Sequence, residues 1–102
     1  MKIKLKNIFK YHPEQLIRRC GYGRIQDGRT GEVSFAKRFG AGLYPRFHIY
    51  LKEITDGFEI NLHLDQKKAS YSGSHAHSGE YDGEVLEREA TRILKMLAGM
   101  KE

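Results

Sequence analysis

Four stretches of the chain alternate apolar and polar residues, which is the pattern of a β-strand with one buried and one exposed face. They cover residues 2–8, 32–38, 47–52 and 58–65. Asp56 and Gly57 separate the last two stretches and form a dipeptide that is typical of a tight hairpin turn. In the first stretch the polar positions are lysines, which protect a sheet edge from pairing. The pattern therefore predicts three strands and an N-terminal edge strand.

The predicted hairpin brings four polar side chains together. If the Asp-Gly dipeptide supplies both turn residues, Tyr50 lies opposite His63 and His48 lies opposite Asp65. The apolar residues of both strands then face the core, and these four side chains share the opposite face. We expect this polar face of the hairpin to carry the chemistry of the protein.

Two segments have apolar residues at helical spacing. The longer helix is expected to begin near Gly83, and its apolar stripe consists of Leu86, Ala90, Ile93, Leu94 and Leu97. A shorter helix is expected to begin at Pro13 and to end near Gly21. Its apolar side consists of Leu16, Ile17 and Cys20. Between this helix and the next strand, the glycine-rich segment 21–31 predicts a series of turns.

These elements predict an α+β fold with a three- to four-stranded antiparallel sheet, one face of which is covered by the C-terminal helix and the short N-terminal helix. A chain of 102 residues builds one modest core, so we expect a single domain over residues 1–102. A long loop rich in His, Ser and Gly, residues 66–82, joins the last strand to the C-terminal helix. Loops of this length in a compact domain are either functional or disordered.

The net charge of +5 is unevenly distributed along the chain. Residues 1–52 hold twelve Lys and Arg against three Asp and Glu, a net charge of +9. A basic surface attracts polyanions, so RNA or DNA is a candidate partner, and the alternative is a lysine-rich surface without such a partner. The residues expected to contact nucleic acid are Arg18, Arg19, Arg24, Arg29, Lys37, Arg38 and Arg46.

The histidines of the long loop suggest a metal site. Imidazoles and carboxylates are the nitrogen and oxygen ligands of zinc. The loop follows the strand that carries His63 and Asp65, and it can fold back over the polar face of the hairpin. The candidate ligands of a divalent metal such as zinc are His63, Asp65, His75, His77 and Glu80. The alternative is that the loop histidines are solvated residues of a flexible tract.

The hairpin histidines suggest a second activity, the metal-independent cleavage of RNA. One imidazole removes the 2′-hydroxyl proton and a second protonates the leaving oxygen. His48 and His63 are the candidate catalytic pair, and Asp65 is placed to hold the His48 ring in one tautomer. The alternative is a set of polar side chains that only form hydrogen bonds on the sheet.

The leading hypothesis is therefore a small binding module with a His-rich site for a divalent metal or a phosphate-bearing ligand, associated with nucleic acid. A metal-independent ribonuclease and a non-catalytic scaffold or assembly subunit are the alternatives, so the sequence leaves open whether the protein is an enzyme. The single cysteine, Cys20, forms no intramolecular disulfide, which favours the cytoplasm. No run reaches the length of about 18 apolar residues that a membrane helix needs, so we expect no membrane partner.

Overall fold

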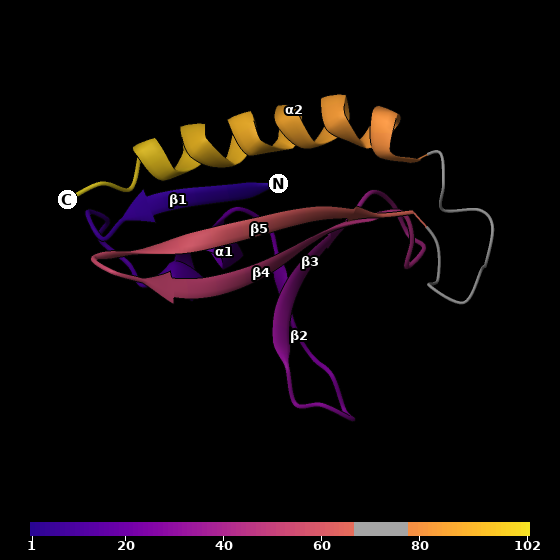
Figure 1. Ribbon diagram of the computed structural model, residues 1–102, viewed down its shortest axis with the longest axis horizontal. Helices are drawn as coiled ribbons and strands as arrows, with labels where there is room; N and C mark the ends of the chain where they lie inside the picture. The colour runs from indigo at the N-terminus through magenta and orange to yellow at the C-terminus, as the bar shows by residue number, and fades with distance from the viewer. Residues whose placement is uncertain (67–77) are drawn as a thin grey trace.

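The computed structural model describes the backbone of residues 1–66 and 78–102, and the side chains of 1–66 and 83–102. Its elements are β1 (Lys2–Lys6), α1 (Pro13–Arg19), β2 (Gly23–Gln26), β3 (Val33–Arg38), β4 (Arg46–Ile54), β5 (Gly57–Asp65) and α2 (Ser78–Ala98). The strands form one antiparallel sheet in the order β1-β5-β4-β3-β2 (Figure 1). The α+β prediction is confirmed, and β1 is an edge strand as expected.

Both helices contribute to one core on the same side of the sheet. In Figure 1, α2 runs along β1 and β5. Its buried residues Ala90, Ile93 and Leu97 join the same core cluster as Leu16 and Ile17 of α1. The strand residues of this cluster are Phe35, Phe47, Ile49, Phe58, Ile60 and Leu62, which alternate along their strands with polar residues. The period-two pattern therefore identified the core face correctly.

The sheet has five strands, one more than the sequence predicted, because β2 lies in the segment that was expected to form only turns. Its four residues contain one apolar side chain, Ile25, so they show no alternation. These residues form a strand because they pair with β3, although their own sequence does not favour one. Tertiary context here overrides local propensity.

The hairpin between β4 and β5 closes on Thr55 and Asp56, so the predicted turn at Asp56 and Gly57 is wrong by one residue. Asp56 adopts the left-handed backbone conformation with a φ of 59°. Gly57 is instead the first residue of β5 and pairs with Ile54. A Cβ atom on Gly57 would overlap the carbonyl oxygen of Leu5 in β1. The glycine is therefore needed where two strands approach closely, and not in the turn.

This turn changes every pair that was predicted across the hairpin. The observed pairs are His48 with His63, Tyr50 with Asn61 and Arg46 with Asp65. The slip amounts to two positions along the partner strand, so each side chain moves along the strand but keeps its face. The four polar residues predicted to share a face do share it.

The helix α2 begins at Ser78, earlier than the expected start near Gly83. The last part of the predicted loop 66–82 is therefore helical, and residues 67–77 lie outside the described residues. Leu94 is 39% exposed and does not belong to the buried stripe. No helix in the described part of the chain is long and apolar enough to span a membrane.

Candidate functional site

The face of the sheet opposite the helices carries polar side chains from four strands. Residues paired across neighbouring strands project to the same side, so the register defines this surface. We call it the open face, and its polar members are Lys2, Lys4, Lys6, Ser34, Arg38, Arg46, His48, Tyr50, Lys52, Glu59, Asn61, His63 and Asp65. It gathers basic, acidic, hydroxyl and imidazole side chains from four strands, and we treat it as the candidate site.

A chain of hydrogen bonds runs across three strands of the open face. His48 Nε2 lies 2.7 Å from Ser34 Oγ, and His48 Nδ1 lies 2.9 Å from Asp65 Oδ2. Arg46 donates from Nε to the same Asp65 oxygen over 3.1 Å. The hydrogen bond with His48 and the bond from Arg46 hold the pKa of the Asp65 carboxyl below its usual range. Because Asp65 is ionised, it orients both the His48 ring and the Arg46 guanidinium.

The order Ser34, His48, Asp65 matches the nucleophile, base and orienting acid of serine hydrolases. However, Ser34 lies within β3 and is 6% exposed, and His48 is 9% exposed. A substrate carbonyl therefore has little access to the serine oxygen. We assign this network to joining β3, β4 and β5 and to fixing Arg46, because a fully satisfied polar network makes a surface rigid.

The accessible rings of the open face belong to Tyr50 and His63. Their centroids lie 5.8 Å apart in an edge-to-face arrangement, and the Tyr50 ring also lies 4.7 Å from the ring of His48. The neighbouring side chains desolvate part of the otherwise exposed His63 ring, and this partial desolvation and the nearby N-terminal amino group lower the pKa of His63. Its imidazole is therefore neutral at pH 7 and presents a planar ring without charge.

The predicted catalytic pair, His48 and His63, is brought together as directly opposed residues of β4 and β5. Asp65 bonds the His48 ring, as the ribonuclease hypothesis expected. Both nitrogens of His48 are engaged with protein groups, whereas His63 is exposed. His63 is therefore the member of the pair that can meet a ligand, and catalysis by the pair stays a prediction.

The predicted metal ligands are only partly described. His63 and Asp65 lie on the open face, whereas His75 and His77 and the side chain of Glu80 lie outside the described residues. Among the residues whose side chains are placed, no three His, Cys, Asp or Glu gather as a metal site. The two described residues are of the types that zinc accepts, and the zinc site stays a prediction.

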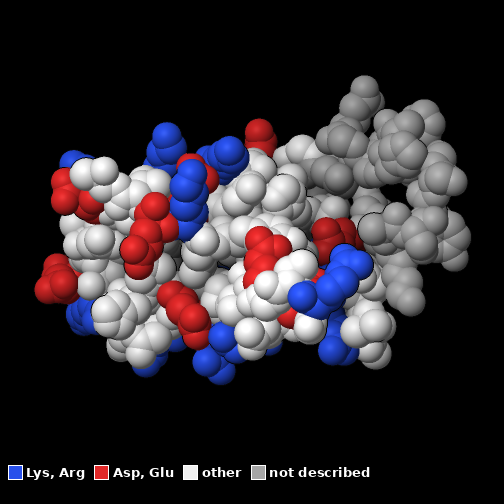
Figure 2. Space-filling model, turned by 60° about the horizontal axis from the view of Figure 1, so that its bottom comes forward, with Lys and Arg blue, Asp and Glu red and all other residues white. Residues whose placement is uncertain are grey.

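The seven residues predicted to contact nucleic acid are spread over the molecule. They are Arg18 and Arg19 of α1, Arg24 of β2, Arg29 of the following turn, Lys37 and Arg38 of β3, and Arg46 of β4. The register places only Arg38 and Arg46 on the open face. Arg24 lies 3.9 Å from a carboxylate oxygen of Glu14, and the Arg19 guanidinium lies 3.9 Å from the centroid of the Tyr11 ring. Basic and acidic side chains are interspersed on the face shown in Figure 2.

The sequence analysis missed two groups of residues on the open face. The first is the lysines at positions 2, 4 and 6, which were interpreted only as protection of the sheet edge. Their alternation with apolar residues was the signal that could have placed them beside Tyr50 and His63. The second is Ser34, whose contact with His48 depends on the register between β3 and β4 and has no signature in the sequence. Comparison of the chain with protein-family models, curated proteins and solved structures finds no match.

Proposed function

We propose that this protein binds single-stranded RNA or DNA on the open face of its sheet. The observation that supports this proposal is the position of two ring side chains, Tyr50 and His63, among lysines from the neighbouring strands. Base stacking on such rings and phosphate contacts with such lysines are how proteins bind single strands without reading their sequence.

The balance of charge on the open face favours a polyanion. Six Lys and Arg stand against two acidic residues in the register, Glu59 and Asp65. Asp65 is bonded to Arg46, and Glu59 is 8% exposed between its cross-strand neighbours Lys4 and Lys52. The residues in the register therefore carry a positive excess, which raises the local concentration of phosphate groups. Negative charge also reaches this face from Glu32 and Asp27, which add to burial in raising the pKa of the Tyr50 hydroxyl.

The rings of Tyr50 and His63 can stack with bases, which a surface of lysines alone cannot do. Stacking of a base on an aromatic ring contributes about 1–3 kcal/mol, and it tolerates every base because each has a planar face. The lowered pKa of His63 keeps its ring neutral at pH 7, so stacking there does not depend on protonation. We therefore expect weak base selectivity and a preference for single strands, whose bases are free to stack.

The test is fluorescence anisotropy with a labelled single-stranded oligonucleotide at several salt concentrations. The wild-type affinity is expected to fall steeply with salt. Lys2→Gln combined with Lys52→Gln is expected to reduce the salt slope by about one for each phosphate that the variant no longer neutralises. His63→Ala is expected to weaken binding about tenfold with an unchanged slope, because it removes a stacking surface and no charge.

The matched control is Lys95→Gln, which removes one exposed lysine from α2. It is expected to bind as the wild type does. Undetectable binding by the folded wild-type protein at low salt would overturn the proposal, and so would equal binding by the lysine variants and the control. Circular dichroism of each variant establishes that the fold is intact.

A further inference from the structure

The strand β4 extends beyond its neighbour β3. The two strands pair from Arg46 to Ile49 of β4, whereas β4 pairs with β5 along its full length to Ile54. Figure 1 shows the reason, because the hairpin of β2 and β3 turns away from the plane of β4 and β5. Residues 50–54 of β4 therefore have a neighbouring strand on one side only, although β4 is the central strand of the sheet.

The hairpin turn determines which backbone groups this edge presents. A two-residue turn makes Ile54 and Gly57 a hydrogen-bonded pair, so the backbone groups of Leu51 and Glu53 point away from β5. They point toward the side that β3 has left. In the described part of the chain, neither β3 nor any loop forms a backbone hydrogen bond with these two residues. Such groups are a template for an added strand.

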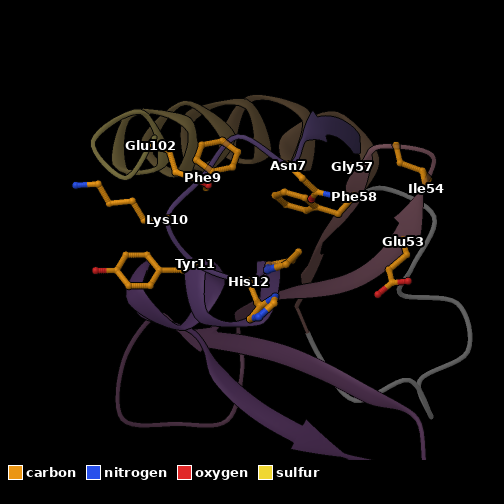
Figure 3. A pocket seen from close by; sticks show the side chains of 11 residues that line it. Asn7, Phe9, Lys10, Tyr11, His12, Glu53, Ile54, Gly57, Phe58 and Glu102 are labelled. Atoms are coloured by element: carbon orange, nitrogen blue, oxygen red, sulfur yellow. The ribbon is translucent and has the colours of Figure 1, made fainter.

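A groove of about 530 Å³ lies beside this edge (Figure 3). Glu53 and Ile54 of β4 form one wall, and the segment 9–13 forms another. The aromatic part of its lining includes Phe9 and Phe58, whose rings contact each other edge to face at 6.2 Å. The volume is within the range of natural ligand sites, and it is larger than one apolar side chain needs.

The charged residues of the groove favour a basic ligand. Glu53 and Glu102 belong to its lining, and both residues are exposed. Lys10 also belongs to the lining, but Figure 3 shows its side chain extended away from the other labelled residues. A Lys or Arg side chain of a ligand would therefore meet carboxylates at the rim.

We propose that this groove binds an extended peptide segment of a partner protein. The peptide adds as a short strand to β4 along Leu51 and Glu53, and it places one apolar side chain in the groove, beside the half-buried ring of Tyr11. A neighbouring Lys or Arg of the peptide faces Glu53. Main-chain hydrogen bonds then supply affinity, and the groove and the carboxylates supply specificity, which is the division found in β-strand addition. This site does not involve the open face, so the proposal is independent of nucleic-acid binding.

The test begins with the selection of short random peptides on the immobilised wild-type protein by mRNA display. Enriched peptides are expected to alternate apolar and polar residues and to contain Lys or Arg. Titration of one enriched peptide is expected to shift the amide resonances of residues 51–54 and 9–12. N-methylation of the peptide amides that face β4 is expected to weaken binding about tenfold each, whereas N-methylation of the alternate amides has no such effect.

Two charge variants complete the test. Glu53→Lys is expected to weaken binding of a basic peptide about tenfold or more. Glu87→Lys makes the same change at an exposed position of α2 and is expected to have no effect. The proposal is overturned if no peptide is enriched, or if binding is insensitive to Glu53→Lys and to the position of N-methylation. A concentration-dependent dimer that Glu53→Lys abolishes would assign the edge to a second copy of the chain and would also overturn it.

Discussion

Gly57 is the residue on which the pairing of the sheet depends most directly. It is the first residue of β5, it pairs with Ile54 of β4, and it lies opposite Lys6 of β1. No other residue type fits, because a Cβ would overlap the Leu5 carbonyl. This one position therefore controls how closely the edge strand β1 can approach the central hairpin.

Gly57→Ala is expected to destabilise the protein by about 2–3 kcal/mol, because the backbone of β1 must move to admit the methyl group. Urea unfolding followed by circular dichroism measures the change. The matched control is Gly28→Ala, where a Cβ would meet no atom within 4 Å. A loss of stability no greater than that of the control would show that β1 can shift without cost.

The same residue shows what the sequence could predict at the scale of single positions. The Asp-Gly dipeptide correctly indicated a hairpin, but its glycine was assigned to the turn. The steric requirement comes from Leu5, about fifty residues away in the sequence, and no local rule includes it. Ser34 is a similar case, because a serine in a strand gives no sign of the histidine that it will bond.

At the scale of elements, the two helices are joined by one buried polar group. Tyr22, which follows α1, donates its hydroxyl to Glu89 of α2 over 2.6 Å. Arg92 donates to both oxygens of Glu89 and to the carbonyl of Cys20. Burial and the bond to Glu89 raise the pKa of Tyr22, so the hydroxyl remains a donor. Burial alone would raise the pKa of Glu89, but its bonds from Arg92 and Tyr22 leave it lowered.

Tyr22→Phe is expected to destabilise the protein by about 1.5–2 kcal/mol, because a buried carboxylate loses a hydrogen-bond donor. Tyr11→Phe is the matched control, since it makes the same chemical change at a half-buried ring whose hydroxyl has no hydrogen bond in the described part of the chain. Thermal unfolding compares the two variants. Equal losses would mean that the bond to Glu89 contributes nothing.

The elements also show why the sheet was only partly predictable. Strands β1, β3, β4 and β5 and both helices carry their own periodicity, and each was predicted. Strand β2 has a single apolar residue and depends on its partner. The hairpin pairs were wrong, yet the candidate site was still gathered on one face, because a slip of two positions preserves the faces of a strand.

At the scale of the whole molecule, two groups of the open face are expected to make stability fall in acid. The pKa of His63 is lower in the folded protein than its ordinary value of about 6.5. The unfolded chain therefore binds this proton at a higher pH than the folded protein does, and the free energy of unfolding decreases as the pH falls below about 6.5. The lowered pKa of Asp65 adds stability above about pH 4, and this contribution is lost as the pH falls through the folded-state value.

The free energy of unfolding, measured in urea from about pH 7 to about pH 3, is therefore expected to decline in two stages. His63→Gln should flatten the stage just below about pH 6.5, and Asp65→Asn should flatten the stage below about pH 4. Profiles that keep the same slopes in both variants would show that other groups cause the acid sensitivity.

The divergence of β3 from β4 has a consequence for how this fold can vary. The hairpin of β2 and β3 is held to the rest of the sheet by four residue pairs, whereas β4 and β5 share nine. Local opening is easiest where the fewest pairs must break, so we expect the hairpin of β2 and β3 to open before β4 and β5 separate. The loop that joins β2 to β3, residues 27–32, can therefore gain or lose residues while the spacing of β1, β5 and β4 stays the same.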